Sequence, residues 1–306
     1  MCTAVNLTGN FHFFGRNLDL DCNFGETALT VPENYLLCFR HTGDFKSLYS
    51  ILGTGISADG FPLYFDAMNS AGLCGAGLNF PGCANYRKEL ENHLNLCSFE
   101  VIPYVLSRCK TLREAIDLLK NANITDDSFS DSYPSTPTHW LFGDKSGSIA
   151  VEPLERGLNL TVTVSGVLTN SPEYDFHKNN LARYPHLSPK SCITDGSVLA
   201  GGTVSLPGGL TSEDRFVRAS FFTSNLHRGT SDEERGDIQS ILSSVNVPRG
   251  SVLTTDGKLH YTKYSTYYET DSLRYVYTAN GASLPFITTL KKSTNTGSDI
   301  EVTKFY

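Results

Sequence analysis

The sequence begins MCTAVNLTGNFHFFGRNLD over residues 1–19, and the pattern of this stretch predicts the first elements of the fold. Residues 3–7 and 11–16 form two runs that are rich in β-branched and aromatic side chains. The Gly9-Asn10 pair between these runs is typical of a tight hairpin turn. We therefore expect two antiparallel strands at the N-terminus, with Cys2 on the first strand.

Two registers of this hairpin are compatible with the sequence. A direct pairing across the turn sets Cys2 opposite Asn17. A bulge at Gly15, a small residue inside a strand, would slip the register by one. The slipped register places Arg16 and Leu18 on the same face of the hairpin as Cys2. It places Asp19 beside the main-chain nitrogen of Cys2.

Removal of Met1 would leave Cys2 with a thiol and a free α-amine on the same carbon atom. In peptides an α-amine titrates at about pH 8 and a thiol at about 8.5, so the amine can accept the thiol proton as a general base. An arginine near the sulfur favours the thiolate, and an aspartate near the amine orients it. The alternative is a structural role, because a free cysteine is most often a small buried apolar residue.

The composition argues against several classes of function. The chain has 306 residues, 40% hydrophobic and 19% charged, which is ordinary for a globular protein. A net charge of -7 without a Lys/Arg block argues against a nucleic-acid partner. No run reaches the roughly 18 apolar residues that span a bilayer, and the N-terminus lacks a basic region followed by an apolar one. We expect one domain over residues 1–306, located in the cytoplasm.

The cysteines and histidines do not predict a metal site. The eight cysteines include no Cys-x-x-Cys pair, so neither a zinc site nor a disulfide framework is expected, and reduced thiols suit a cytoplasm. The eight histidines form no His-x-x-x-His pair and no Glu-x-x-His motif. His139, beside Trp140 in an apolar run, is expected in the core. We expect no cofactor.

Hydrophobic periodicity predicts the order sheet, helices, sheet, helices, sheet. Strands are expected after the hairpin at residues 35–40, 49–54, 63–68, 73–79, 138–143, 148–152, 158–164, 167–168, 259–268, 272–277 and 286–290. Helices are expected at 97–107, 111–122 and 173–182, and after the caps at Thr211 and Ser231. Residues 126–137 and 184–209 are expected to be loops. This order indicates an α+β fold in which two mainly antiparallel sheets pack together and helices cover both outer faces.

The glycine spacing of residues 72–79 is typical of a strand that another backbone or a ligand approaches closely. A phosphate-binding loop is the alternative. It lacks support, because no lysine or helix start follows where such a loop would need one.

With these elements assigned, the chain resembles the choloylglycine hydrolase family, the N-terminal-nucleophile hydrolases that include bile salt hydrolases and penicillin V acylases. The resemblance covers most of the chain and is weakest over residues 184–202 and after Leu290. The resemblance rests on five motifs whose separations along the chain are close to those of the family: Met1-Cys2-Thr3, Phe14-Gly15-Arg16-Asn17-Leu18-Asp19, Gly77-Leu78-Asn79-Phe80-Pro81, Leu168-Thr169-Asn170-Ser171-Pro172 and Arg215-Phe216-Val217-Arg218. Each motif alone is weak, but together and in order they are specific.

The resemblance implies a four-layer αββα sandwich that is activated by loss of Met1, and a homotetramer. It implies that Cys2 supplies the attacking sulfur and the amine, with Arg16 beside the sulfur and Asp19 beside the amine. Asn170 and Asn79 would hold the oxyanion of the tetrahedral intermediate, and Arg215 matches the family's active-site arginine. Asn170 could instead be only a turn residue or a helix cap. The sequence departs from the family at residues 207–209, where Pro-Gly-Gly replaces the usual Pro-Gly-Asp.

Asn79 bears on the substrate. In the resemblance, bile salt hydrolases carry Asn at this position and typical penicillin V acylases carry Tyr, so the sequence favours bile salts. By analogy an apolar steroid pocket would be lined by the 126–137 loop and by Leu18, Phe61, Tyr64 and Phe65. Core packing is an equally open interpretation of these aromatic residues.

The sequence therefore predicts hydrolysis of the amide bond between a bile acid and glycine or taurine, through an acyl-enzyme on Cys2. One alternative is a penicillin V acylase or N-acyl amide hydrolase that uses the same groups with a different pocket. Another alternative, from a different class, is a non-catalytic binder of bile acids or lipids that retains Met1.

Overall fold

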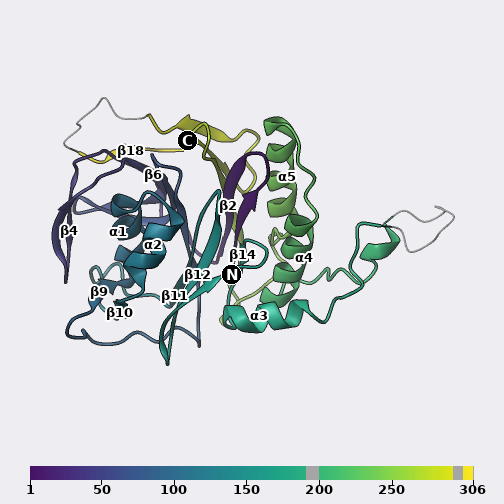
Figure 1. The fold of residues 1–306 in the computed structure, drawn as a ribbon, viewed down its shortest axis with the longest axis horizontal. Coiled ribbons are helices and arrows are strands. Elements are labelled where there is room, and N and C mark those ends of the chain that lie inside the picture. Colours follow the sequence, from purple (N-terminus) through teal and green to yellow (C-terminus); the bar gives the residue numbers. More distant parts are fainter. Residues whose placement is uncertain (191–199, 292–298, 306) are drawn as a thin grey trace.

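The structure is a computed structural model that describes residues 1–190, 200–291 and 299–305. Two antiparallel sheets lie between two layers of helices, with α1 and α2 on one side and α4 and α5 on the other (Figure 1). The predicted αββα sandwich is confirmed. None of the described helices is long and apolar enough to cross a membrane.

The first sheet combines strands from both ends of the chain. Its order is β14 (Val167–Leu168), β1 (Cys2–Thr8), β2 (His12–Leu20), β15 (Tyr261–Glu269), β16 (Arg274–Ala279) and β17 (Phe286–Thr289). Helices α4 (Ser212–Ser224) and α5 (Ser231–Ser244) pack on its outer face, and α3 (Tyr174–Leu181) packs beside α4. Strand β1 thus lies inside the sheet, where it pairs with β2 from Cys2 onward and with β14 at Ala4 and Val5.

The second sheet has the order β13 (Gly157–Val162), β12 (Gly147–Leu154), β11 (Thr138–Asp144), β8 (Cys74–Asn79), β7 (Phe61–Asn69), β6 (Ile51–Ala58), β3 (Thr27–Val31) and β18 (Glu301–Thr303). Helices α1 (Val101–Arg108) and α2 (Leu112–Leu119) cover its outer face. Two small pairs complete the fold, β4 (Leu36–Phe39) with β5 (Gly43–Lys46), and the parallel β9 (Leu94–Cys97) with β10 (Ala122–Thr125). Short helices are η1 (Ser98–Glu100) and η2 (Gly201–Thr203).

Two buried clusters explain why the layers hold together. Successive side chains of a strand point to opposite faces of the sheet. In β11, Leu141 joins the cluster between the sheets, whereas Trp140 and Phe142 join the cluster beneath α1 and α2. His139 is buried in the same strand, where it contacts Glu152 at 3.2 Å and the Thr169 carbonyl at 2.9 Å. The prediction that His139 belongs to the core is confirmed.

The N-terminal hairpin adopts the register that sets Leu18, and not Asn17, opposite Cys2. The expected cause was wrong, because Gly15 pairs regularly with Val5 and the extra residue lies in the turn. Glu234 of α5 accepts hydrogen bonds from the main-chain nitrogens of Asn10 at 2.9 Å and Phe11 at 3.0 Å. The helix therefore holds a wider turn than the sequence suggested.

Most predicted elements are present, with shifted ends. Residues 120–122 do not continue α2, because Ala122 begins strand β10. The cap of α5 is Thr230, whose side chain accepts from the Glu233 nitrogen at 3.3 Å, and not Ser231. The sequence missed strands that are short or polar: β3, β5, β9, β10 and β18. The predicted strand at residues 73–79 is confirmed as β8, and the predicted loop at 184–209 lies partly outside the described residues.

Candidate active site

Cys2 is buried at the start of β1, and its sulfur accepts a hydrogen bond from Nη2 of Arg16 at 3.0 Å. Arg16 stands here because Cys2 pairs with Leu18 and alternate residues of β2 share a face. Nη1 of Arg16 donates to the Phe65 carbonyl at 3.0 Å, which fixes the guanidinium. A buried cation beside the sulfur favours negative charge on it.

A buried carboxylate, Asp66 of β7, lies behind Arg16, with its Oδ2 3.6 Å from Nη1. Four hydroxyl groups donate to this carboxylate at 2.5–3.2 Å, from Thr54, Tyr264, Thr266 and Tyr268. Burial alone would lower the pKa of Arg16, but Cys2, Tyr264 and Asp66 together raise it. Sequence reasoning missed Asp66, because no local pattern links it to partners two hundred residues away.

The main-chain nitrogen of Cys2 donates to Oδ1 of Asn170 at 2.7 Å. Nδ2 of Asn170 donates to the Asn79 carbonyl at 2.7 Å, so the strand end of β8 and the segment after β14 meet beside Cys2. The backbone of Asn170 is held by Ser212, which accepts from its nitrogen at 2.9 Å, and by His177, 2.8 Å from its carbonyl. Asn170 is therefore more than a turn residue, since its amide reaches both Cys2 and Asn79.

Arg215 of α4 is buried and binds the same group of residues. Its Nη1 donates to the Cys2 carbonyl at 2.5 Å and to the Thr3 hydroxyl at 2.6 Å, while Nη2 donates to Oδ1 of Asn170 at 2.7 Å. Burial lowers the pKa of Arg215, and the negative charge of Asp19 partly opposes this effect. Arg215 touches the main chain of Cys2 and not its sulfur, so we assign it a positioning role.

The α-amine of Met1 lies 2.9 Å from the Asp19 carbonyl and 2.5 Å from Nε2 of His260. Burial lowers the pKa of this amine. The Asp19 side chain accepts from the Thr262 hydroxyl at 2.6 Å through Oδ1. Within the described residues its Oδ2 is buried without a hydrogen-bond partner, and burial raises the pKa of Asp19. Sequence reasoning missed Thr262 and His260, which no motif marked.

A cavity of about 460 Å³ opens onto the Cys2 side chain, a size typical of small-molecule sites. Of the predicted pocket residues, Leu18, Tyr64 and Phe65 line this cavity, as does Asn79. The predicted loop contributes further lining residues, among them Phe129, Ser132, Tyr133 and Pro134. The lining is therefore mostly apolar, with Arg16 and Asn79 among its polar members.

Phe61 does not line this cavity, contrary to expectation. It packs edge-on against Phe99 and lies 6.0 Å from the ring of Phe129, measured between centroids, and both of these residues line the cavity. Phe61 instead faces a neighbouring groove that includes Tyr35 and Phe39. Phe61 belongs to the cluster beneath α1, and the rings of Phe99 and Phe129 lie between it and the cavity wall that they form.

The loop that departs from the family pattern, at residues 207–209, is held by Arg218. Nη1 of Arg218 donates to the Pro207 carbonyl at 2.6 Å and to the Gly209 carbonyl at 3.0 Å. The loop thus has defined partners although it lacks the usual aspartate. Every cysteine in the described part of the chain is free.

Comparisons with known proteins agree with this geometry. The family model described as linear amide C–N hydrolases, choloylglycine hydrolase family, matches residues 2–293. A bile salt hydrolase/transferase of Lactiplantibacillus plantarum is 36% identical over 288 residues, which are 90% of this chain and 88% of the relative. A conjugated bile acid hydrolase of Lactobacillus acidophilus is 34% identical over 291 residues, covering 90% and 91% of the two chains.

Solved structures agree as well. A variant of the conjugated bile acid hydrolase from Clostridium perfringens superposes with a TM-score of 0.91 at 30% identity, covering 100% of this chain and 97% of the other. Penicillin V acylase from Agrobacterium tumefaciens has the same fold, with a TM-score of 0.78 at 22% identity over 94% of this chain and 86% of the other. The chain is an amide hydrolase and belongs to the choloylglycine hydrolase family of linear amide C–N hydrolases.

Proposed function

We propose that the protein hydrolyses the amide bond between a bile acid and glycine or taurine, with Cys2 as nucleophile. The observation that carries this proposal is the Cys2 sulfur, held 3.0 Å from a buried arginine and facing an apolar cavity. Relatives named as bile salt or conjugated bile acid hydrolases, which match about 90% of the chain, support the substrate class.

The reaction begins after Met1 has been removed. The new α-amine of Cys2 takes the thiol proton, and Arg16 stabilises the thiolate electrostatically. The sulfur attacks the amide carbonyl, forming a carbon–sulfur bond while the carbonyl electrons move onto oxygen. Amide groups of Asn79 and Asn170 donate to this oxyanion, at the point where negative charge develops.

Collapse of the intermediate breaks the carbon–nitrogen bond. The protonated amine gives its proton to the leaving nitrogen of glycine or taurine, which frees the amine to act as base again. Water then attacks the thioester, with its proton going to the amine, and the bile acid leaves as a carboxylic acid. The amine must be oriented through both steps. The acceptors that we assign to it are Oδ1 of Asn170 and Oδ2 of Asp19, which has no hydrogen-bond partner among the described residues.

The cavity supports a steroid as the acyl group. Its volume and apolar walls suit a rigid hydrophobic body whose carboxyl end points to Cys2. Asn79 lies in the same wall, at the position where the resemblance separates bile salt hydrolases from penicillin V acylases.

The experiment compares turnover of glycocholate, taurocholate and penicillin V by the purified chain, combined with intact-mass measurement. We expect active preparations to lack Met1 and to prefer the bile salts, and Cys2→Ser to lose nearly all turnover. Normal activity of a species that retains Met1 would contradict the amine as base. A preference for penicillin V would refute the substrate assignment, and binding of bile salts without turnover would support the non-catalytic alternative.

We also infer a homotetramer in the cytoplasm. The family resemblance supports the tetramer, and the free cysteines of the described residues suit a reducing compartment. Sedimentation of the purified protein at several concentrations tests the assembly.

A further inference from the structure

A group of ligand-type side chains lies outside the catalytic centre. His41 follows β4, Cys97 ends β9 and Asp127 follows β10, and one ligand atom from each lies within 4.8 Å of the others. Nε2 of His41 is 2.9 Å from Oδ2 of Asp127, and the Cys97 sulfur is 4.0 Å from the same oxygen. The Thr125 hydroxyl completes the group, 2.7 Å from Oδ2 of Asp127 and 3.7 Å from the sulfur.

We propose that His41, Cys97 and Asp127 form a binding site for a divalent zinc ion. Sulfur, imidazole nitrogen and carboxylate oxygen are the donors that zinc prefers in tetrahedral sites. Zinc–ligand lengths of about 2.0–2.3 Å at tetrahedral angles require ligand separations of about 3.4 Å between N and O and about 3.6 Å between S and O. The observed N–O separation of 2.9 Å and S–O separation of 4.0 Å each differ from these values by about 0.5 Å or less, and the His41 nitrogen and the Cys97 sulfur lie within 4.8 Å of each other.

The surroundings of His41 match those of a metal ligand. Its Nδ1 lies 2.5 Å from a carboxylate oxygen of Glu89, which leaves Nε2 to face Cys97 and Asp127. A metal-bound imidazole commonly donates its other N–H to a carboxylate, because that hydrogen bond fixes the tautomer and strengthens the ligand. Glu89 is thus a positioning residue for the proposed site.

The charges of the site also fit a divalent cation. Binding converts the Cys97 thiol to a thiolate and releases its proton, and Nε2 of His41 binds through its lone pair. The thiolate and the Asp127 carboxylate then balance the two charges of zinc. Glu89 contacts His41 and would not bind the ion itself.

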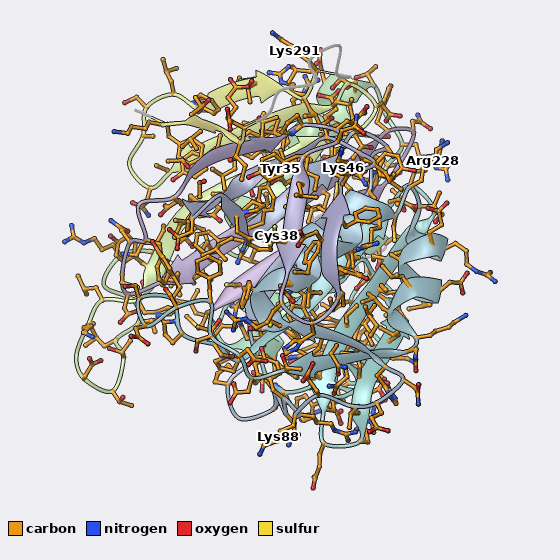
Figure 2. All side chains as sticks on the ribbon, turned by 90° about the vertical axis from the view of Figure 1, so that its left-hand side faces the viewer. Tyr35, Cys38, Lys46, Lys88, Arg228 and Lys291 are labelled. Carbon is orange, nitrogen blue, oxygen red and sulfur yellow. The ribbon has the colours of Figure 1, made fainter. Side chains whose placement is uncertain are left out.

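The site adjoins the 126–137 loop, which forms part of the cavity wall. Asp127 is two residues before Phe129, and the 126–137 loop supplies Tyr133 and Pro134 to the same wall. The β4–β5 hairpin, marked by Cys38 and Lys46, lies at the surface facing the viewer in Figure 2, and His41 is in its turn. Arg40 of that turn already donates to the Ser128 carbonyl at 2.6 Å. A bound zinc ion would therefore link the β4–β5 hairpin, the end of β9 and the 126–137 loop.

Spacing along the sequence did not predict this site, because its ligands come from separate segments at residues 41, 97 and 127. The expectation that the cysteines form no metal site rested on the lack of a Cys-x-x-Cys pair. Such pairs mark sites built on one local loop, and this group depends on the parallel pairing of β9 with β10.

The test uses the full chain with Cys2→Ser, so that the catalytic thiol does not bind metal. Titration with cobalt(II) in place of zinc should produce a thiolate-to-cobalt charge-transfer band that saturates at one ion per chain and is abolished by added zinc. C2S/C97S should lose the band, and C2S/D127N should lose saturable binding. C2S/C109S is the matched control and should keep the band, because Cys109 is also buried with its thiol pKa raised to about 12.

Glu89→Gln in the same background should weaken cobalt affinity about 10-fold to 100-fold, the usual effect of losing such a partner. If C2S/C97S fails to fold, as judged by circular dichroism, the Asp127→Asn and His41→Gln variants decide the question. The proposal is overturned if Cys2→Ser gives no charge-transfer band at saturating cobalt, or if C2S/C97S binds as tightly as its parent. Because the background is catalytically inactive, neither result depends on the proposed substrate.

Discussion

Asn170→Asp separates the chemistry of Asn170 from its role in the fold. The substitution keeps the shape of the side chain and the Oδ1 acceptor that receives hydrogen bonds from the Cys2 nitrogen and Arg215, both at 2.7 Å. It replaces the Nδ2 donor with an oxygen that then faces the Asn79 carbonyl oxygen at 2.7 Å. The variant therefore loses a donor to the oxyanion while it retains the contacts that hold Cys2.

The expected magnitudes follow from these contacts. Loss of one oxyanion donor lowers kcat by about 10²-fold to 10³-fold, equivalent to about 2.7–4 kcal/mol. The unmade hydrogen bond to the Asn79 carbonyl costs about 1–3 kcal/mol of folding stability, and a charge-assisted bond to Arg215 offsets part of it. KM for glycocholate should change little, because the oxyanion that accepts from Nδ2 of Asn170 forms only in the transition state and not in the bound substrate.

The assay measures glycine release from glycocholate over a range of substrate concentrations, and unfolding in urea. Asn69→Asp is the matched control, because Nδ2 of Asn69 is also buried and donates to two backbone carbonyls, at 2.8 and 2.9 Å, away from Cys2. Asn69→Asp should lose stability and keep kcat. A kcat for Asn170→Asp close to that of the unmodified protein would refute the oxyanion role, as would an equal loss of kcat in Asn69→Asp.

Three further predictions concern the cavity, the packing of the sheets and the dependence of stability on pH. Phe65→Ala should raise KM for glycocholate about 10-fold to 100-fold with little change in kcat, because it removes apolar surface worth about 1.5–3 kcal/mol, and steady-state kinetics that leave KM unchanged would contradict this. Gly53→Ala should lower the unfolding free energy in urea by about 1–3 kcal/mol, since its new Cβ would meet the Asp66 carbonyl oxygen at 2.1 Å, whereas Gly236→Ala, in open space on α5, should raise it by up to about 1 kcal/mol. Burial lowers the pKa of His12 to about 4, so between pH 6.5 and 4 the unfolded chain binds a proton that the folded chain excludes. Stability should therefore fall as pH falls through that window, by at most about 1.4 kcal/mol per unit from this residue, and an unchanged slope in His12→Gln would rule the explanation out.

Local sequence signals predicted the elements that depend on short-range physics. The N-terminal hairpin, the Thr111 and Thr211 caps and the alternation in β11 rest on turn geometry, on helix N–H groups that need acceptors and on the period of a strand. The family resemblance added candidate residues far apart in the sequence. The structure brings Asn170 and Arg215 into contact with Cys2, and the oxyanion role of Asn170 and the positioning role of Arg215 stay predictions.

Tertiary structure decided what no local pattern could specify. The hairpin register depends on Glu234 of α5, which holds the turn, and the second sheet closes with β18 from the far end of the chain. Phe61 and Phe65 look alike in sequence, yet packing against different layers places one behind the cavity wall and the other in it.

The same distinction applies to charge. Arg16 was predicted to lie near the sulfur, but Asp66 and its four hydroxyl donors were not, because those partners come from three other strands. A buried ion is stable only when it is paired with an opposite charge and its polar atoms are hydrogen-bonded. The partners of Arg16 and Asp66 come from segments that meet only when the two sheets pack. The sequence by itself determined which residues can carry the chemistry, and the packing of the layers determined which groups surround them.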